Sequence, residues 1–250
     1  MRAGPFHLAA VHLLHLHAGY RAGVVGCSAS VPVLRDVSLR VAAGASQLVH
    51  GAPGAGVTTL LHCAAGLRQP WRGSASAFGV PAARALRDGV LAFVPHAPVL
   101  YASFTVRDVL ACAAARAAAR ADRECALGLE LDRPVPRLTE AERWCAALAG
   151  ALASGARLLV LDVPAVVVRS AAARHVLRRA CALAAQRGGG ALLGAGSGGA
   201  LPVDRRLALA GGRVLAEPWP AGDGVARVAE ARLGHASLTR ASVDPSPGAS

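Results

Sequence analysis

Short apolar runs alternate with helical stretches along most of the chain. Residues 158–162 (LLVLD) form a continuous apolar run closed by a carboxylate, which is the pattern of a strand buried on both faces of a sheet. Similar runs occur at 47–50, 90–94 and 191–193, and the stretch 171–186 predicts a helix. Because buried strands alternate with helices, we predict an α/β fold with a mainly parallel sheet and flanking helices.

Alternation of polar and apolar residues at both ends of the chain predicts antiparallel strands beside this sheet. Residues 6–17 and 31–41 alternate in this way, and we expect the glycine-containing segment between them to be a loop. Residues 206–210 and 213–215 flank Gly-Gly and predict a hairpin. These strands would give the fold an antiparallel β edge.

The middle of the chain has a helical composition. Residues 104–153 are rich in Ala, Arg and Leu and are interrupted by Pro134 and Pro136, so we predict a short helical subdomain inserted at about 99–153. The remainder of 1–217 would form a single α/β domain with this insertion. Residues 218–250 are predicted to be a partly disordered C-terminal extension.

A glycine-rich turn joins the predicted strand at 47–50 to a following helix. Its spacing fits G-x-x-x-x-G-K-[ST] except at Val57, where lysine is expected. The backbone N–H groups of such a loop converge on an anion, the helix dipole favours negative charge, and the hydroxyl of Thr58 is a ligand for Mg²⁺. The motif therefore predicts a phosphate-binding site that lacks its cation.

Composition narrows the classes of function. The formal net charge is +12, and all 27 basic residues are Arg, so codon bias would explain arginine in place of lysine but does not explain Val57. The arginines are scattered and only 4% of residues are aromatic, so we expect no nucleic-acid binding. The six cysteines contain no C-x-x-C pair, which favours buried thiols over disulfides or a metal site. No apolar run reaches about 18 residues, so no membrane-spanning helix is expected.

The order of the motifs resembles the ATP-binding subunit of ABC transporters, from about residue 31 to residue 214. The phosphate loop is followed by FVPH at 93–96, LTEAER at 138–143, LLVLD at 158–162 and LALAGGRV at 207–214. The resemblance implies a P-loop NTPase-like fold, with 1–217 as an ABC-type nucleotide-binding domain and ATP and Mg²⁺ as cofactors. The implied nucleotide-binding positions are Gly51, Gly54, Ala55, Gly56, Val57, Thr58, Thr59, Tyr20, His96 and Asp162, and Mg²⁺ would contact Thr58 and Asp162.

Several functional positions of that family carry different residues here. The phosphate-contacting lysine falls at Val57, and the metal-sensing glutamine falls at His96. The glutamate that activates water falls at Val163, the switch histidine falls near Gly196, and an aspartate of the following loop falls at Arg169. We therefore assign no catalytic residue. Loss of the lysine would weaken nucleotide binding roughly ten- to a hundredfold. Loss of the general base would lower the rate of hydrolysis by a factor of roughly 10²–10⁴.

Two further positions depart from the family pattern or remain open. The family signature has serine followed by two glycines, and Thr139-Glu140-Ala141-Glu142 stands in its place. These residues form a capping-box sequence, in which the helix start is satisfied by its own side chains and Glu140 would repel a phosphate. Tyr20 is the tyrosine within reach of an adenine, and a stacking role and a loop tyrosine without a ligand are both compatible with the sequence.

We therefore expect a degenerate ATP-binding cassette subunit of an ABC transporter, which binds nucleotide weakly or not at all and does not hydrolyse it unaided. Its expected partners are a membrane permease subunit, a second ATP-binding subunit in a dimer, or both. Its expected location is cytoplasmic, peripheral at the inner face of the cell membrane. Two alternatives stand beside this: a slow ATPase completed by a dimer partner, and a scaffold or binding module for a different ligand on the same fold.

Overall fold

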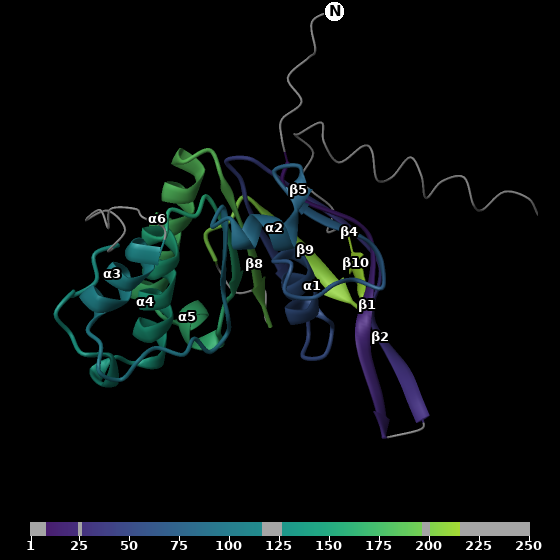
Figure 1. Cartoon of the computed structure of the whole chain (residues 1–250), viewed down its shortest axis with the longest axis horizontal. Helices are drawn as coiled ribbons and strands as arrows, with labels where there is room; N and C mark the ends of the chain where they lie inside the picture. The colour runs from purple at the N-terminus through teal and green to yellow at the C-terminus, as the bar shows by residue number, and fades with distance from the viewer. Residues whose placement is uncertain (1–8, 25–26, 117–126, 197–200, 216–250) are drawn as a thin grey trace, which may run out of the picture. The chain divides into compact units, whose positions relative to one another are not determined.

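The computed structural model describes residues 9–24, 27–116, 127–196 and 201–215, and its strands form two sheets (Figure 1). The larger sheet has six strands in the order β10-β9-β3-β8-β7-β6. All neighbouring pairs in it are parallel except β10 with β9. Its strands are β3 (Ser46–His50), β6 (Leu91–Val94), β7 (Leu158–Asp162), β8 (Gly190–Ala195), β9 (Arg205–Ala210) and β10 (Arg213–Leu215). The predicted α/β fold class with a mainly parallel sheet is confirmed.

The smaller sheet is antiparallel and has the order β2-β1-β4-β5. Its strands are β1 (Ala9–Val24), β2 (Cys27–Ala42), β4 (Arg72–Ala77) and β5 (Val80–Pro81). The predicted loop between residues 17 and 31 is wrong, because β1 and β2 continue to pair through it, with Tyr20 opposite Val31. Position 19 of this strand requires glycine, because a Cβ atom there would lie 2.1 Å from the carbonyl oxygen of Val31.

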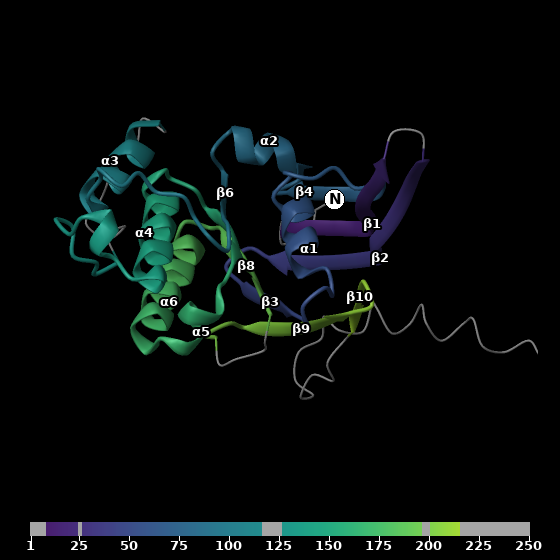
Figure 2. The same ribbon diagram turned by 90° about the horizontal axis from the view of Figure 1, so that it is seen from below.

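Helices cover both faces of the parallel sheet. In Figures 1 and 2, α3, α4 and α6 lie on one side of β8, and α1 and the β1–β2 hairpin lie on the other. The stretch around Pro134 interrupts the helical region as predicted, but the six-residue α2 has too little periodicity to be found from sequence. The helices are α1 (Val57–Ala64), α2 (Ala82–Arg87), α3 (Val106–Arg116), α4 (Glu140–Ala153), α5 (Ala165–Arg169), α6 (Ala171–Gln186) and the 3₁₀ turn Val135–Arg137.

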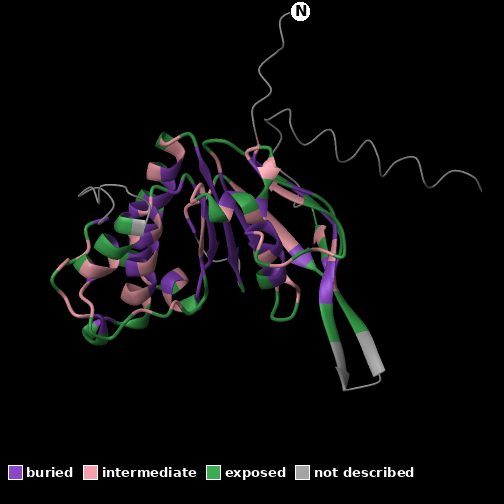
Figure 3. Ribbon diagram, in the orientation of Figure 1, coloured by how far each residue is buried: buried purple, intermediate pink, exposed green. Residues whose placement is uncertain are grey.

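The core consists of two apolar clusters, one on each face of the parallel sheet. Strand β7 shows the division most clearly, because all five of its residues are buried. Leu159 and Leu161 pack with the α4 and α6 side, whereas Leu158 and Val160 pack with α1 and the antiparallel sheet. The purple strands at the centre of Figure 3 show this burial. The alternation fixes which way the side chain of Asp162 points at the end of the strand.

The limits of the predicted domain stay a prediction. The proposed extension 218–250 lies outside the described residues. Among the described helices, none is long and apolar enough to cross a bilayer.

Candidate functional site

The glycine-rich loop leads directly from β3 into α1. Ala55 N donates to Ala52 O over 2.9 Å and closes a turn, and Gly56 adopts φ +104 as the N-cap of α1. A Cβ atom at Gly56 would lie 2.9 Å from Val33 Cγ1, and one at Gly51 would lie 2.5 Å from Leu209 O. Only glycine therefore lets this loop lie against β2 and β9.

The start of α1 is open to an anion. Its N-cap Gly56 offers no side-chain hydrogen bond to the first turn, and the first turn contains no acidic residue. The N–H groups of the first turn have no carbonyl partner within the helix, and the helix dipole makes this end positive. Loop and helix start together fit a phosphate group, as the spacing of Gly51, Gly54, Ala55 and Gly56 predicts.

Three predicted site residues meet at the end of β7. Thr58 Oγ1 donates to Asp162 Oδ2 over 3.0 Å. The Nδ1 atom of His96 lies 3.9 Å from Asp162 Oδ1, and the Asp162 side chain is 8% exposed while that of His96 is 60% exposed. A hydroxyl and a carboxylate are oxygen ligands of the kind that Mg²⁺ prefers. The pair Thr58 and Asp162 therefore fits the predicted magnesium contact.

The side chain of Val57 packs inside the protein beneath the loop, and its Cγ2 atom would lie 3.4 Å from a Cβ atom placed on Gly51. Val57 is 9% exposed and belongs to the apolar cluster on the α1 face of the sheet. Its Cγ1 atom would lie 2.6 Å from a Cβ atom placed on Gly194 of β8, so glycine at 194 is what makes room for it. At this position the site has a packed methyl group and no cation.

Val163 is also part of the core. It is 1% exposed, lies in the cluster on the α4 face, and donates its backbone N–H to Gly194 O over 2.8 Å. Gly196, where the switch histidine was expected, is exposed and is followed by residues outside the described part of the chain. Arg169 is exposed at the end of α5. None of these three described positions carries a group able to take a proton from water.

The start of α4 differs from that of α1, because its own side chains satisfy it. Thr139 Oγ1 accepts from Glu142 N over 3.3 Å, and Glu142 Oε2 accepts from Thr139 N over 2.8 Å. The predicted capping box is therefore present. The backbone N–H of Thr139 lowers the pKa of the Glu142 carboxyl, and Arg133, which pairs with it, adds to this effect. The carboxylate of Glu142 therefore occupies the N-terminus of α4.

Tyr20 lies on strand β1 beside the start of α1. Its hydroxyl is 3.2 Å from Thr59 Oγ1, which is buried in α1. The guanidinium of Arg68 covers one face of the ring at 4.2 Å from its centroid, a contact that the sequence did not suggest. Tyr20 as a whole is 43% exposed. Stacking on a base stays a prediction.

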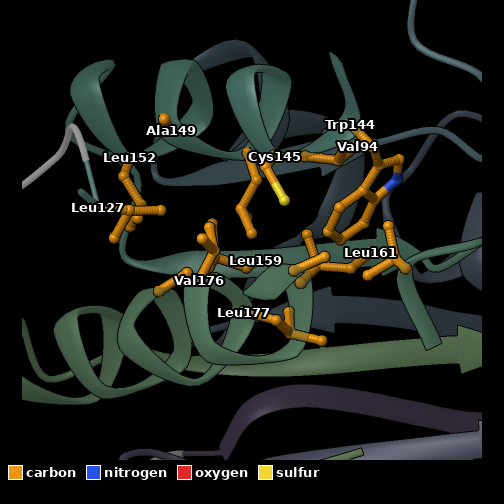
Figure 4. Packing of buried hydrophobic residues seen from close by; sticks show 14 of the residues in the cluster. Val94, Leu127, Trp144, Cys145, Ala149, Leu152, Leu159, Leu161, Val176 and Leu177 are labelled. Carbon is orange, nitrogen blue, oxygen red and sulfur yellow. The ribbon is translucent and has the colours of Figure 1, made fainter. Parts of the chain in front are cut away.

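Trp144 is a residue of this region that the sequence argument missed. It is fully buried on α4, and its Nε1 donates to both Pro95 O and Asp162 O at 3.1 Å. Figure 4 shows the indole ring beside Leu161, with its nitrogen on the side away from Cys145 and Leu159. The available signal was the presence of a single large aromatic in an alanine-rich helix.

A family model for ABC transporters matches residues 34–166, which is more than half of the chain. The chain belongs to the ABC transporter family. This assignment agrees with the order of the loop, the capped helix and the buried strand described above.

Two curated relatives and one solved structure illustrate the similarity of this ABC family chain. The cytochrome c biogenesis ATP-binding export protein CcmA of Cereibacter sphaeroides is 34% identical over 145 residues, which are 56% of this chain and 65% of that protein, less than two thirds of its length. CcmA of Alkalilimnicola ehrlichii is 32% identical over 62% of this chain and 70% of that protein. The dimeric ATP-binding cassette MJ0796, bound to ADP and Pi in a post-hydrolysis state, shares the fold with a TM-score of 0.70 at 18% identity, over 85% of this chain and 100% of that one.

A cavity of about 410 Å³ lies elsewhere on this ABC cassette, among the helices α3, α4 and α6. It is lined in part by Thr139, Glu142 and Cys145, and by none of the predicted nucleotide contacts. Burial raises the pKa of the Cys145 thiol to about 12, so the thiol stays protonated at neutral pH. We do not assign this cavity to the nucleotide.

Proposed function

We propose that this chain is an ATP-binding subunit of an ABC transporter that holds nucleotide weakly and does not hydrolyse it unaided. The observation that carries the proposal is the burial of Val57 and Val163 in the two apolar clusters. The two residues take the places of the phosphate-binding cation and the water-activating base. A general base contributes roughly 10²–10⁴-fold to such a reaction, so its loss leaves little turnover.

The site retains the groups that would hold a Mg–nucleotide. The backbone amides from Gly51 to Gly56 would bind phosphate oxygens, and Thr58 and Asp162 would hold Mg²⁺. When bound, the ion would compensate part of the phosphate charge that no lysine meets here. Weak, metal-dependent binding without hydrolysis is the behaviour that these residues support.

A subunit of this kind acts through partners. The relatives are named as ATP-binding export and import proteins, and MJ0796 is described as a dimer. By analogy, this chain would sit beside a membrane permease or a competent second ATP-binding subunit, in the cytoplasm at the inner face of the membrane. Its capped α4 start, with the exposed carboxylate of Glu140, would give such a partner little help with a phosphate.

The test compares phosphate release and thermal stability for the wild type and Asp162→Asn. We expect the wild type to release phosphate from Mg–ATP no faster than Asp162→Asn does. We also expect Mg–ATP to raise the melting temperature of the wild type through mass action, and not that of Asp162→Asn. Turnover by the wild type that Asp162→Asn abolishes would identify a true ATPase. Turnover only after adding a partner subunit would support the slow, partner-completed enzyme. If neither Mg–ATP nor Mg–ADP changes the melting temperature of the wild type, a binding module for a different ligand is favoured.

A further inference from the structure

The indole N–H of Trp144 bridges the ends of two neighbouring parallel strands. Strands β6 and β7 pair as far as Val94 and Leu161, and the carbonyls of Pro95 and Asp162 follow directly after this last pair. Trp144 Nε1 donates to both carbonyls at 3.1 Å. One side chain of α4 thus holds together two strand ends beyond the point where the strands pair with each other.

The direction of the Asp162 carbonyl explains why it needs this donor. The next residue, Val163, donates its N–H to Gly194 O on β8. The C=O and N–H of one trans peptide point in opposite directions, so the Asp162 carbonyl faces away from β8 and toward β6. This carbonyl belongs to a buried residue, and a buried carbonyl without a donor is unfavourable. Trp144 supplies the donor there.

The two strand ends that Trp144 joins carry two predicted site residues. His96 follows Pro95 directly, and its Nδ1 lies 3.9 Å from Asp162 Oδ1. Asp162 in turn accepts from Thr58 at the start of α1. A change in the separation of the two carbonyls would therefore change the geometry around the carboxylate that would hold Mg²⁺.

We infer that Trp144 is a positioning residue that sets the spacing of His96 and Asp162 and so couples helix α4 to the metal-binding pair. The inference rests on the proposed function for its consequence, because the positioned groups are those that would hold Mg–nucleotide. Trp144 lies on the same helix as the Thr139–Glu142 cap and within its first two turns, so a displacement at the start of α4 would be transmitted to both strand ends.

The coupling has a mechanical basis in the packing around the ring. Trp144 is 0% exposed and packs in the same cluster as Val94, Leu159 and Leu161 (Figure 4). A ring held on all sides cannot reorient to keep its hydrogen bonds when the helix shifts. The strand ends therefore follow the helix.

The test uses Trp144→Phe, which keeps a ring and removes the donor, with Trp71→Phe as the control at an exposed tryptophan. Amide hydrogen exchange is measured on peptides spanning 94–98 and 160–164. We expect faster exchange in both segments of Trp144→Phe, unchanged exchange in β3 and β9, and no change in Trp71→Phe. Exchange that rises throughout the sheet, or in neither segment, would overturn the inference.

A second readout addresses the metal pair. We expect the affinity of Trp144→Phe for Mg–ATP, measured by melting-temperature titration, to be at least about fivefold lower than that of the wild type. This is the effect of losing about one hydrogen bond. Equal affinity would overturn the coupling even if exchange changes. If the wild type itself shows no Mg–ATP shift, the proposed function fails and the exchange measurement alone decides the role of Trp144. If Trp144→Phe does not fold, Trp144→His takes its place, because histidine retains a ring N–H donor. Exchange in both segments that is unchanged from the wild type would then support the inference. Faster exchange in both segments would overturn it.

Discussion

The hydroxyl of Thr58 donates to the carboxylate of Asp162 over 3.0 Å and joins the first turn of α1 to the end of β7. Asp162 is 6% exposed, so most of its surroundings are protein. The bond lies where the parallel strands end and the glycine-rich loop turns into the helix. It fixes the two oxygen groups that would meet Mg²⁺.

We predict that Thr58→Val lowers the free energy of unfolding by about 1–3 kcal/mol at neutral pH, because a buried carboxylate loses a donor. The shape of the side chain is retained, so packing contributes little to this loss. Urea denaturation measures the effect, and Thr58→Ser, which keeps the hydroxyl, is the matched control. Equal stability of the valine and serine variants would show that the bond contributes nothing.

Restoring the cation should strengthen nucleotide binding. We predict that Val57→Lys binds Mg–ATP roughly ten- to a hundredfold more tightly than the wild type, the effect of a charge-assisted hydrogen bond. Val57 packs against Gly51 of the loop, so the apolar stem of a lysine would take the place of the valine while its ammonium group extends toward the phosphate site. Val57→Met supplies a long side chain without charge and should change affinity little. Isothermal titration calorimetry compares the three proteins, and an equal gain in the methionine variant would contradict the electrostatic explanation.

Placing a glutamate at position 163 should destabilise the protein, because this position is buried. Val163 is 1% exposed within the apolar cluster on the α4 face, so Val163→Glu would bury a carboxylate without a partner. We expect a loss of roughly 3–5 kcal/mol in the free energy of unfolding. Val99, which is 97% exposed, provides the control Val99→Glu, with an expected change within about 0.5 kcal/mol. Comparable losses in the two variants would show that burial is not the cause.

Much of the fold follows from local pattern. The apolar run at β7, the helix α6 and the capping box of α4 are specified by residues adjacent in sequence, and all three were predicted. The grouping of Thr58, His96 and Asp162 also follows, because parallel strands bring their carboxyl ends to one edge of the sheet.

The remaining features depend on contacts between distant segments. The continuation of β1 and β2 past residue 17 requires Gly19 to accommodate Val31 and Trp71, which no local pattern encodes. The inward direction of Val57 depends on Gly194 in another strand. The double hydrogen bond of Trp144 joins residues 49 and 18 positions away. Such pairings become visible only when the sheet is assembled.

The pH dependence of stability should reflect the cap of α4. The Thr139 backbone N–H lowers the pKa of Glu142 below its ordinary value of 4.5, so ionised Glu142 stabilises the folded state above that value. This contribution is lost as the pH falls from about 4.5 through the lower folded-state pKa. We predict that Glu142→Gln flattens the dependence of unfolding free energy on pH in this acid range.

The contribution of the α4 cap to the free energy of unfolding can also be measured at neutral pH. Thr139→Ala should cost about 1 kcal/mol of unfolding free energy, the usual effect of losing a threonine N-cap. Glu140→Gln is the matched control, because Glu140 is exposed in the same turn and its side chain makes no hydrogen bond within the described part of the chain. Urea denaturation at neutral pH and at several acid pH values compares the variants. If Glu140→Gln and Glu142→Gln flatten the acid range equally, the helix dipole, and not the capping box, is the source of the effect.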